Sequence, residues 1–200
     1  MIAVIDYGAG NVFNVLKACD YLGADARLTD DPQEILQADG IIFPGVGAFK
    51  SAMNRLQQRG LDQVLKQAVQ AGIPLLGICL GMQMLFESSA EFGLTQGLGL
   101  IPGKVVQLPD DGLFIPQVGW NQNQLKQPSP LFQSVDQEYT YFVHSYYAQC
   151  PQQYVVASVD YGVPVPSIVQ RGKVYGMQFH PEKSGRVGLK LLQSFFNETR

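Results

Sequence analysis

Residues 74–86 read PLLGICLGMQMLF. The apolar run that ends at Ile78 predicts a buried strand, and the methionine-rich stretch after it predicts a helix. Between the two, GICLG at residues 77–81 has the spacing of a nucleophile elbow, in which glycines flank a reactive side chain at a strand-to-helix junction. We expect these glycines to let the backbone turn tightly, so that Cys79 projects from the end of the strand.

Cys79 has the surroundings of a reactive thiol. The following helix would direct its N-terminal dipole and free N–H groups at the sulfur and stabilise the thiolate, and the N–H of Leu80 would face a developing oxyanion. The alternative is a buried cysteine that acts as a small hydrophobe. The flanking glycines favour the nucleophile for Cys79, whereas Cys19 and Cys150 lack such surroundings and are expected to be structural.

A thiol nucleophile usually works with a histidine, and the chain has two. His180 ends the strand-like run VYGMQF and is followed by Pro181 and Glu182. In an extended segment residues i and i+2 face the same side, so Glu182 is expected to orient the imidazole, with Pro181 keeping the pair out of a helix. His144 has no carboxylate within two residues and is expected to be a packed strand residue. The sequence therefore predicts a catalytic set of Cys79, His180 and Glu182.

A glycine-containing loop, PGVG at residues 44–47, follows the strand expected at Gly40–Phe43, which Pro44 should end. Such a loop can turn its backbone N–H groups toward a carbonyl oxygen. The earlier segment DYGAGN is not a dinucleotide-binding fingerprint, because position 13 is Phe where that motif requires glycine.

The first half of the chain alternates apolar runs with amphipathic stretches. This alternation predicts βαβ units, with a mostly parallel sheet and helices on both of its faces. The expected strands are Ile2–Asp6, Ala26–Thr29, Gly40–Phe43 and Pro74–Ile78. The expected helices are Val12–Leu22 with Asn11 as its cap, the EILQA stretch after Asp31 and Pro32, Ser51–Arg59 and Leu61–Ala71.

After about residue 100 the pattern changes, because turns rather than helices separate most apolar runs. We expect an antiparallel or mixed extension of the same sheet, closed by a helix near Gly188–Asn197. The chain would then be one α/β domain over residues 1–200, in three layers. The strand-like runs are Lys104–Leu108, Tyr139–Val143, Tyr146–Ala148, Val155–Val159, Ser167–Gln170 and Lys173–Gln178.

The composition restricts the classes of function. Two hundred residues, 46% of them hydrophobic, suffice for one core, and a formal net charge of -3 gives no reason to expect nucleic acid or an anionic membrane as a partner. Neither a signal peptide nor a spanning helix is expected. Three widely spaced cysteines predict no disulfide framework, no metal site and a reduced, cytoplasmic protein. No cofactor is expected.

The elbow GICLGMQ, the later HPE and the PGVG loop together resemble the class I, triad-type glutamine amidotransferases over nearly the whole chain. The resemblance implies a flavodoxin-like fold and release of ammonia from glutamine, with Cys79 as nucleophile, His180 as general base and Glu182 as its orienting partner. The implied oxyanion and substrate-binding residues are Gly45, Val46, Gly47, Leu80, Gln83, Ser145 and Tyr146.

A narrower resemblance is to the glutaminase subunits of imidazole glycerol phosphate synthases. It rests on DYGAGNVFNV, PQVGWN (Pro116–Asn121), YFVHSYY and HPEKSG, although Gln117 stands where many such subunits have histidine. It implies a heterodimer with a (β/α)8-barrel cyclase subunit, which combines the ammonia with PRFAR to give imidazole glycerol phosphate, for histidine biosynthesis, and AICAR. Near the ammonia exit we expect the segment Tyr7–Asn14 and a half-exposed Trp120. The implied interface residues are Asn11, Asn14, Trp120, Asn121, Tyr141 and Lys183.

Two other interpretations stay open. A glutaminase of this kind could act alone or supply another synthase, although 200 residues leave no room for an acceptor domain, which favours transfer to a second polypeptide. A non-enzymatic binding protein on a flavodoxin-like scaffold is the other alternative. The intact Cys79, His180 and Glu182 argue against it.

Overall fold

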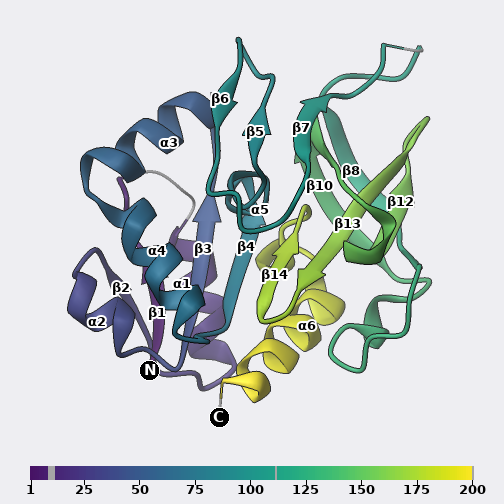
Figure 1. Ribbon diagram of the computed structural model, residues 1–200. Coiled ribbons are helices and arrows are strands. Elements are labelled where there is room, and N and C mark those ends of the chain that lie inside the picture. Colours follow the sequence, from purple (N-terminus) through teal and green to yellow (C-terminus); the bar gives the residue numbers. More distant parts are fainter. Residues whose placement is uncertain (9–11, 111, 200) are drawn as a thin grey trace.

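The computed structural model describes residues 1–8, 12–110 and 112–199, and an eight-stranded sheet forms its centre (Figure 1). From β2 to β14 the neighbouring strands run parallel, and from β14 to β9 they run antiparallel. This confirms the predicted α/β fold with a mixed sheet, and the order of its first four strands is flavodoxin-like. In spatial order the strands are β2 (Ala26–Thr29), β1 (Ile2–Ile5), β3 (Gly40–Gly45), β4 (Leu75–Cys79), β14 (Val174–Met177), β13 (Pro164–Arg171), β12 (Val155–Asp160) and β9 (Gln124–Leu125).

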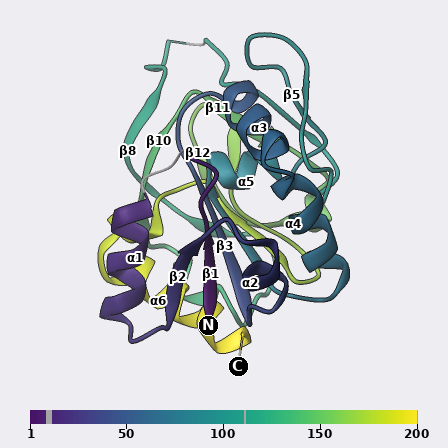
Figure 2. The ribbon, with the colours of Figure 1, turned by 90° about the vertical axis from the view of Figure 1, so that its left-hand side faces the viewer.

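Helices cover both faces of this sheet, as predicted (Figure 2). Because of this cover, β1, β3 and β4 are buried at every position, which explains why they read as continuous apolar runs. Two separate hydrophobic clusters fill the two faces. One face carries α1 (Val12–Tyr21) and α6 (Gly185–Glu198), and the other carries α2 (Pro32–Leu36), α3 (Phe49–Gln58) and α4 (Leu61–Gln70).

Local signals account for these helices. Asp31 caps α2 by accepting a hydrogen bond of 2.8 Å from the N–H of Gln33, and Pro32 occupies the first turn. In α3 the buried residues recur at helical spacing, which fixes the face that packs on the sheet. They are Phe49, Ala52, Met53 and Leu56. Asn11, the expected cap of α1, lies outside the described residues.

The second half only partly extends the main sheet, which corrects one expectation. The runs at Val155–Val159, Ser167–Gln170 and Lys173–Gln178 joined it, as β12, β13 and β14. The runs at Lys104–Leu108, Tyr139–Val143 and Tyr146–Ala148 lie instead in a two-stranded and a four-stranded sheet, because strand pairing depends on distant partners that a single segment does not specify. The smaller sheets contain β8 (Gln117–Gln122) with β10 (Tyr139–His144), and β11 (Tyr146–Gln149), β7 (Lys104–Gln107), β5 (Ser88–Ser89) and β6 (Thr95–Gln96).

The boundaries of two elements also differ from expectation. Pro44 does not end its strand, since β3 continues to Gly45. Beyond Ile42, β3 pairs with β4 but no longer with β1, so the missing N–H of Pro44 breaks no pairing with β1. Helix α6 begins at Gly185 rather than near Gly188.

Within the part of the chain that the structure describes, no helix is both long and apolar enough to cross a membrane. The short helices are α5 (Leu80–Met84), η1 (Gln133–Val135), η2 (Gln152–Tyr154) and η3 (Pro181–Lys183).

Candidate active site

Three neighbouring parallel strands, β3, β4 and β14, end at one edge of the sheet. Cys79 is the last residue of β4 and lies opposite Gly45, the last residue of β3. His180 follows β14, whose Met177 is in register with Ile78. The carboxyl ends of parallel strands are where ligands bind in open α/β sheets, so the topology alone brings the thiol and the imidazole together.

The elbow owes its sharpness to Cys79 itself. Its backbone lies at φ 54 and ψ -112, a conformation that costs a residue with a Cβ on the order of 1–3 kcal/mol. Gly77 and Gly81 are not at positive φ, so the expectation that they make the turn is corrected. They permit close packing instead: a Cβ on Gly81 would lie 1.8 Å from the carbonyl oxygen of Phe43, and one on Gly77 2.8 Å from the carbonyl carbon of Gly81.

His180 is held firmly by its neighbours. Its Nδ1 lies 2.8 Å from Oε1 of Glu182, and both side chains are almost completely buried. The pair was expected to form in an extended segment. It forms instead across the first turn of the 3-10 helix Pro181–Lys183, where proline fits the first position. The Ser184 hydroxyl donates to the His180 carbonyl at 2.6 Å and accepts from the N–H of Tyr141 at 3.0 Å, which ties this turn to β10.

The two histidines differ in charge at neutral pH, because their pKa values shift in opposite directions. Burial lowers the pKa of His180, but hydrogen bonds with Cys79 and Glu182 and the charges of both outweigh burial and raise this pKa to about 9. Burial lowers the pKa of His144 to about 4, against the upward effect of its hydrogen bond to the carbonyl of Tyr146. At pH 7 His180 is therefore a cation and His144 is neutral, so His180 is the histidine that carries a proton to donate.

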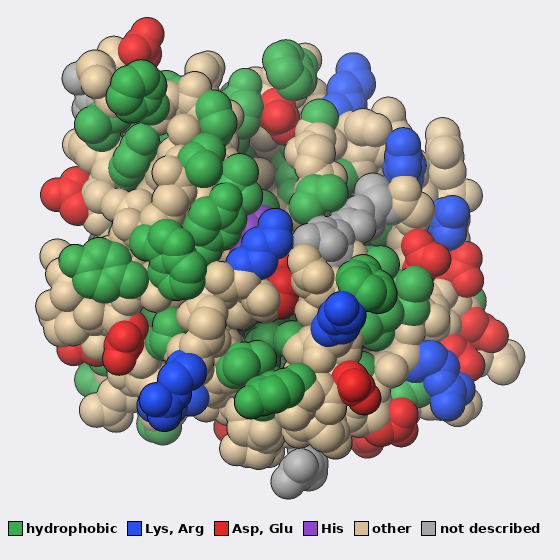
Figure 3. Space-filling model, turned by 180° about the vertical axis from the view of Figure 1, so that it is seen from behind, with side chains coloured by type: hydrophobic (Ala, Val, Ile, Leu, Met, Phe, Trp, Pro, Cys, Tyr) green, Lys and Arg blue, Asp and Glu red, His purple; other side chains and the backbone are tan. Residues whose placement is uncertain are grey.

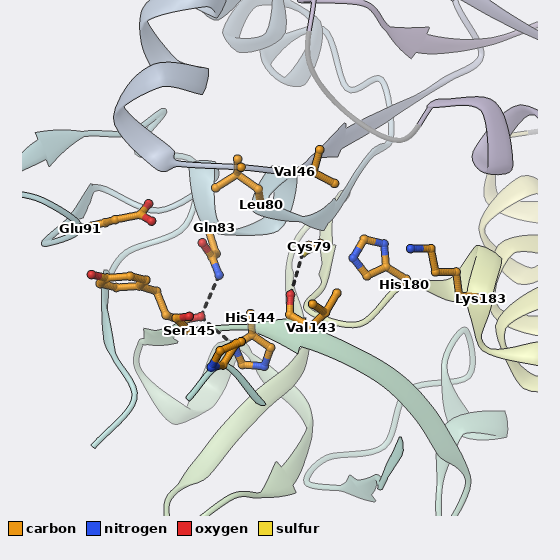
Figure 4. Close-up of a pocket in the computed structure, with 13 residues that line it drawn as sticks. Val46, Cys79, Leu80, Gln83, Glu91, Val143, His144, Ser145, His180 and Lys183 are labelled. Carbon is orange, nitrogen blue, oxygen red and sulfur yellow. Dashed lines mark hydrogen bonds between the residues drawn. The ribbon is translucent and has the colours of Figure 1, made fainter. Parts of the chain in front are cut away.

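A cavity of about 340 Å³ opens in front of Cys79 and His180 (Figure 4). Six of the oxyanion and substrate-binding residues expected from the sequence line it, whereas Gly45 lies behind it in β3. The six are Val46, Gly47, Leu80, Gln83, Ser145 and Tyr146. Further lining residues, which the sequence did not single out for this role, are Glu91, Pro116, Val143, His144 and Lys183.

Two polar residues of the site, Glu91 in the cavity lining and Gln178 beside Cys79, were missed from the sequence. Glu91 lies in the turn between β5 and β6, and its Oε2 accepts a hydrogen bond of 2.6 Å from the N–H of Phe49. Gln178 follows β14, is fully buried, and donates from Nε2 to the sulfur of Cys79 at 3.9 Å. No local signal identifies either residue, since both acquire their partners through long-range pairing.

An apolar surface borders the cavity on one face of the β8–β10 ribbon (Figure 3). Trp120 is 52% exposed, as expected, and its ring lies 6.1 Å from that of Tyr141, its cross-strand partner. The Nζ of Lys183 lies 5.9 Å from the centre of the Tyr141 ring. We call this surface the ribbon face; it consists of Val118, Trp120, Tyr139, Tyr141 and Val143.

Two of the other expected interface residues, Asn14 and Asn121, lie in the described part of the chain, and one does not. Asn14 on α1 and Asn121 on β8 are half-buried, and Asn121 accepts a hydrogen bond of 2.9 Å from the buried Gln117. Asn11 lies outside the described residues. Tyr7, at the start of the segment expected near the ammonia exit, is fully buried, and its hydroxyl donates to the carbonyl of Pro44 at 3.1 Å.

The fold and this site define a class of enzyme. The family described as "Glutamine amidotransferase class-I" matches residues 3–199, so the chain belongs to that family, which confirms the resemblance seen in the sequence. The fold is shared with solved structures. A "Crystal structure of glutamine amidotransferase" has a TM-score of 0.79 at 18% sequence identity, and the match covers 100% of this chain and 99% of that chain. The "Structure of PurLQS from Thermotoga maritima" has a TM-score of 0.76 at 20% sequence identity, and the match covers 100% of this chain and 98% of that chain.

Sequence relatives narrow the class to one kind of subunit. Proteins named "Imidazole glycerol phosphate synthase subunit HisH" are 57% identical in Lactiplantibacillus plantarum, 55% in Streptococcus sanguinis and 52% in Listeria monocytogenes serotype 4b, each over 196 residues. The match covers 98% of this chain and 94%, 95% and 94% of those proteins. Within the class I glutamine amidotransferases, the chain therefore belongs with the HisH subunits.

Proposed function

We propose that this chain is the glutaminase subunit of an imidazole glycerol phosphate synthase, acting as one domain over residues 1–200 in the cytoplasm. It hydrolyses glutamine to glutamate and ammonia and passes the ammonia to a cyclase subunit. The observation that carries the proposal is the position of Cys79, on a strained elbow and in one cavity with the His180 imidazolium that Glu182 holds. The name that its relatives share supports the particular synthase.

The chemistry follows from the charge states. The Cys79 thiolate attacks the side-chain carbonyl carbon of glutamine, and the tetrahedral oxyanion accepts hydrogen bonds from backbone N–H groups of the loop at residues 46–47 and of Leu80. The His180 imidazolium gives its proton to the departing nitrogen, and ammonia leaves. Neutral His180 then removes a proton from water, which attacks the γ-glutamyl thioester, so that glutamate and the thiolate–imidazolium pair are restored.

The polar end of the cavity suits the amino-acid portion of glutamine. Gln83 donates from Nε2 to the Tyr146 carbonyl at 2.8 Å (Figure 4). The same nitrogen donates to Gln178 Oε1 at 3.0 Å, so Oε1 of Gln83 is left as an acceptor. Glu91 adds a carboxylate to the lining. These acceptors favour the α-ammonium group of the substrate, while Ser145 and Tyr146 complete this end of the cavity.

The partner in this proposal is a (β/α)8-barrel cyclase that forms a heterodimer with the chain and converts PRFAR to imidazole glycerol phosphate and AICAR. Ammonia formed at Cys79 would leave at the carboxyl edge of the sheet, next to the ribbon face. A half-exposed tryptophan beside other apolar side chains is a typical interface anchor. Docking there, through Trp120, Tyr141 and Lys183 with Asn14 and Asn121 as further contacts, would shield the ammonia from water.

The test uses the purified cyclase with this chain. Cys79→Ala should abolish glutamine-dependent synthesis of imidazole glycerol phosphate, while synthesis from added ammonium salt by the same complex continues. Cys150→Ala, which removes a thiol that does not line the cavity, is the matched control and should keep both activities. Substantial glutamine turnover by Cys79→Ala would refute the mechanism. Full glutamine hydrolysis without the cyclase and its ligand would instead favour a glutaminase that acts alone.

A further inference from the structure

A chain of buried side-chain amides connects β11 to the sulfur of Cys79. It begins at the carbonyl of Tyr146, which accepts from Nε2 of Gln83 at 2.8 Å. The same nitrogen donates to Oε1 of Gln178 at 3.0 Å, and Nε2 of Gln178 donates to the sulfur at 3.9 Å. Gln83 is 4% exposed and Gln178 is completely buried, so water does not compete for these bonds.

The direction of every bond in this chain is fixed from its far end. A backbone carbonyl can only accept, so Gln83 must turn its NH2 group toward Tyr146. The second hydrogen of that NH2 group then requires an acceptor, which sets the carbonyl oxygen of Gln178 toward Gln83. The amide nitrogen of Gln178 is thereby left facing Cys79. The sulfur consequently meets an N–H donor, whichever protonation state it has.

This donor distinguishes between the two states of the sulfur. Near Cys79 the carbonyl of Val143 lies 4.0 Å away and can only accept, so it favours the protonated thiol. The Gln178 amide can donate, so it favours the thiolate, and it approaches without bringing any charge. A hydrogen bond to an ionised group is stronger than one between neutral groups.

The packing around Gln178 keeps the amide in place. Gly176 and Gln178 are two residues apart and face the same side of the sheet, toward α5. A Cβ on Gly176 would lie 2.6 Å from Cγ of Met82, so the glycine lets α5 approach closely. The N–H of Gln178 also donates to the carbonyl of Ser167 at 2.9 Å.

We infer that Gln178 stabilises the nucleophilic thiolate of Cys79 through this N–H group, and that Gln83, besides lining the substrate cavity, is the positioning residue that orients it. The inference rests on the proposed role of Cys79 as nucleophile. It adds a second donor to the thiolate, independent of His180, and ties the reactivity of the sulfur to a residue that also faces the substrate.

The test is the pH profile of alkylation by iodoacetamide, followed residue by residue by mass spectrometry on the full chain. Gln178→Met removes the donor without adding charge, and Gln83→Met leaves the donor in place but unoriented. For Gln178→Met, the pH of half-maximal alkylation of Cys79 should rise by roughly one unit, equivalent to about tenfold in thiolate stability. Gln83→Met should give a smaller rise. Gln170→Met, on the neighbouring strand β13, is the matched control.

The outcomes separate the two proposals. Cys150 in the same samples is an internal control, and its profile should not move in any variant. A Gln178→Met profile equal to that of the unaltered chain would overturn the role of Gln178, even if the variant melts at a lower temperature, because a merely structural residue changes stability alone. If Gln178→Met does not fold, an unchanged profile in Gln83→Met overturns the inference. If Cys79 of the unaltered chain reacts no faster than Cys150 at any pH, both the nucleophile and this inference fail.

Discussion

The strained backbone of Cys79 leads to a prediction about stability. At φ 54 and ψ -112 a residue with a Cβ carries on the order of 1–3 kcal/mol of strain, which glycine avoids. Cys79→Gly and Cys79→Ala both remove the sulfur and all its contacts, so their difference isolates the backbone. The relief of this strain is partly offset by the greater flexibility of glycine in the unfolded chain, which lowers the free energy of unfolding by about 0.5–1 kcal/mol. Cys79→Gly should therefore be more stable than Cys79→Ala by about 1 kcal/mol.

Cys19 provides the matched pair. It is also fully buried, but it lies inside α1, where the backbone is helical and unstrained. There Cys19→Gly should be less stable than Cys19→Ala by about 1 kcal/mol, the ordinary cost of glycine in a helix. The same two substitutions thus have opposite orders at the two cysteines.

The assay is reversible urea unfolding of the four variants, followed by circular dichroism, with free energies taken from linear extrapolation. The strain argument requires the sign of the glycine–alanine difference to change between Cys79 and Cys19. If glycine were the less stable choice at both positions, and by similar amounts, the elbow would hold no strain and the reasoning would be refuted.

Four further predictions concern packing, pH, the base and docking. Gly81→Ala should destabilise the chain by at least about 1–3 kcal/mol in the same urea assay, because its Cβ would overlap the Phe43 carbonyl; normal stability would contradict the packing. With the pKa of His180 raised from 6.5 to about 9, the imidazolium and the stability it contributes should be fully present below pH 6.5 and lost as the pH rises through 9. Steady-state kinetics should show kcat/KM for glutamine falling over the same alkaline range, and a profile flat beyond pH 10 would exclude His180 as the acid. His180→Asn should lose roughly a hundredfold or more in glutaminase rate and His144→Asn much less, so equal losses would mean that His144 has a comparable role. Trp120→Ala should weaken cyclase binding in a calorimetric titration by about 2 kcal/mol and leave the unfolding midpoint unchanged, whereas unchanged affinity would move the docking surface elsewhere.

Local sequence patterns predicted the parallel half of the fold. Continuous apolar runs such as Pro74–Ile78 indicate strands buried on both faces, and the glycine spacing around Cys79 marks the elbow between strand and helix. The Glu182 partner of His180 was also predicted, although through an extended geometry that the structure replaces with a 3-10 turn. The pair forms because His180, the residue before this turn, is itself extended at φ -97 and ψ 99, with Glu182 two residues further on.

What could not be predicted depends on long-range pairing. Gln178 looks like any polar residue at a strand end, and only the approach of β14 to β4 brings it to Cys79. Glu91 lies in the turn of the β5–β6 hairpin, and its hydrogen bond with the N–H of Phe49 is a long-range contact that the local sequence does not reveal. The strand at Gln117–Gln122 was missed because its only apolar residues, Val118 and Trp120, point outward, while the residues on its inner side are polar or glycine, so no apolar run marks a buried face.

The covalent intermediate tests the central claim most directly. The chain, bound to its cyclase and turning over radiolabelled glutamine, would be quenched in acid, digested and analysed by mass spectrometry. The mechanism predicts a γ-glutamyl thioester on the peptide that contains Cys79, and no adduct in Cys79→Ala. Continued release of labelled glutamate with Cys79 unmodified, and at an equal rate in Cys79→Ala, would contradict the account.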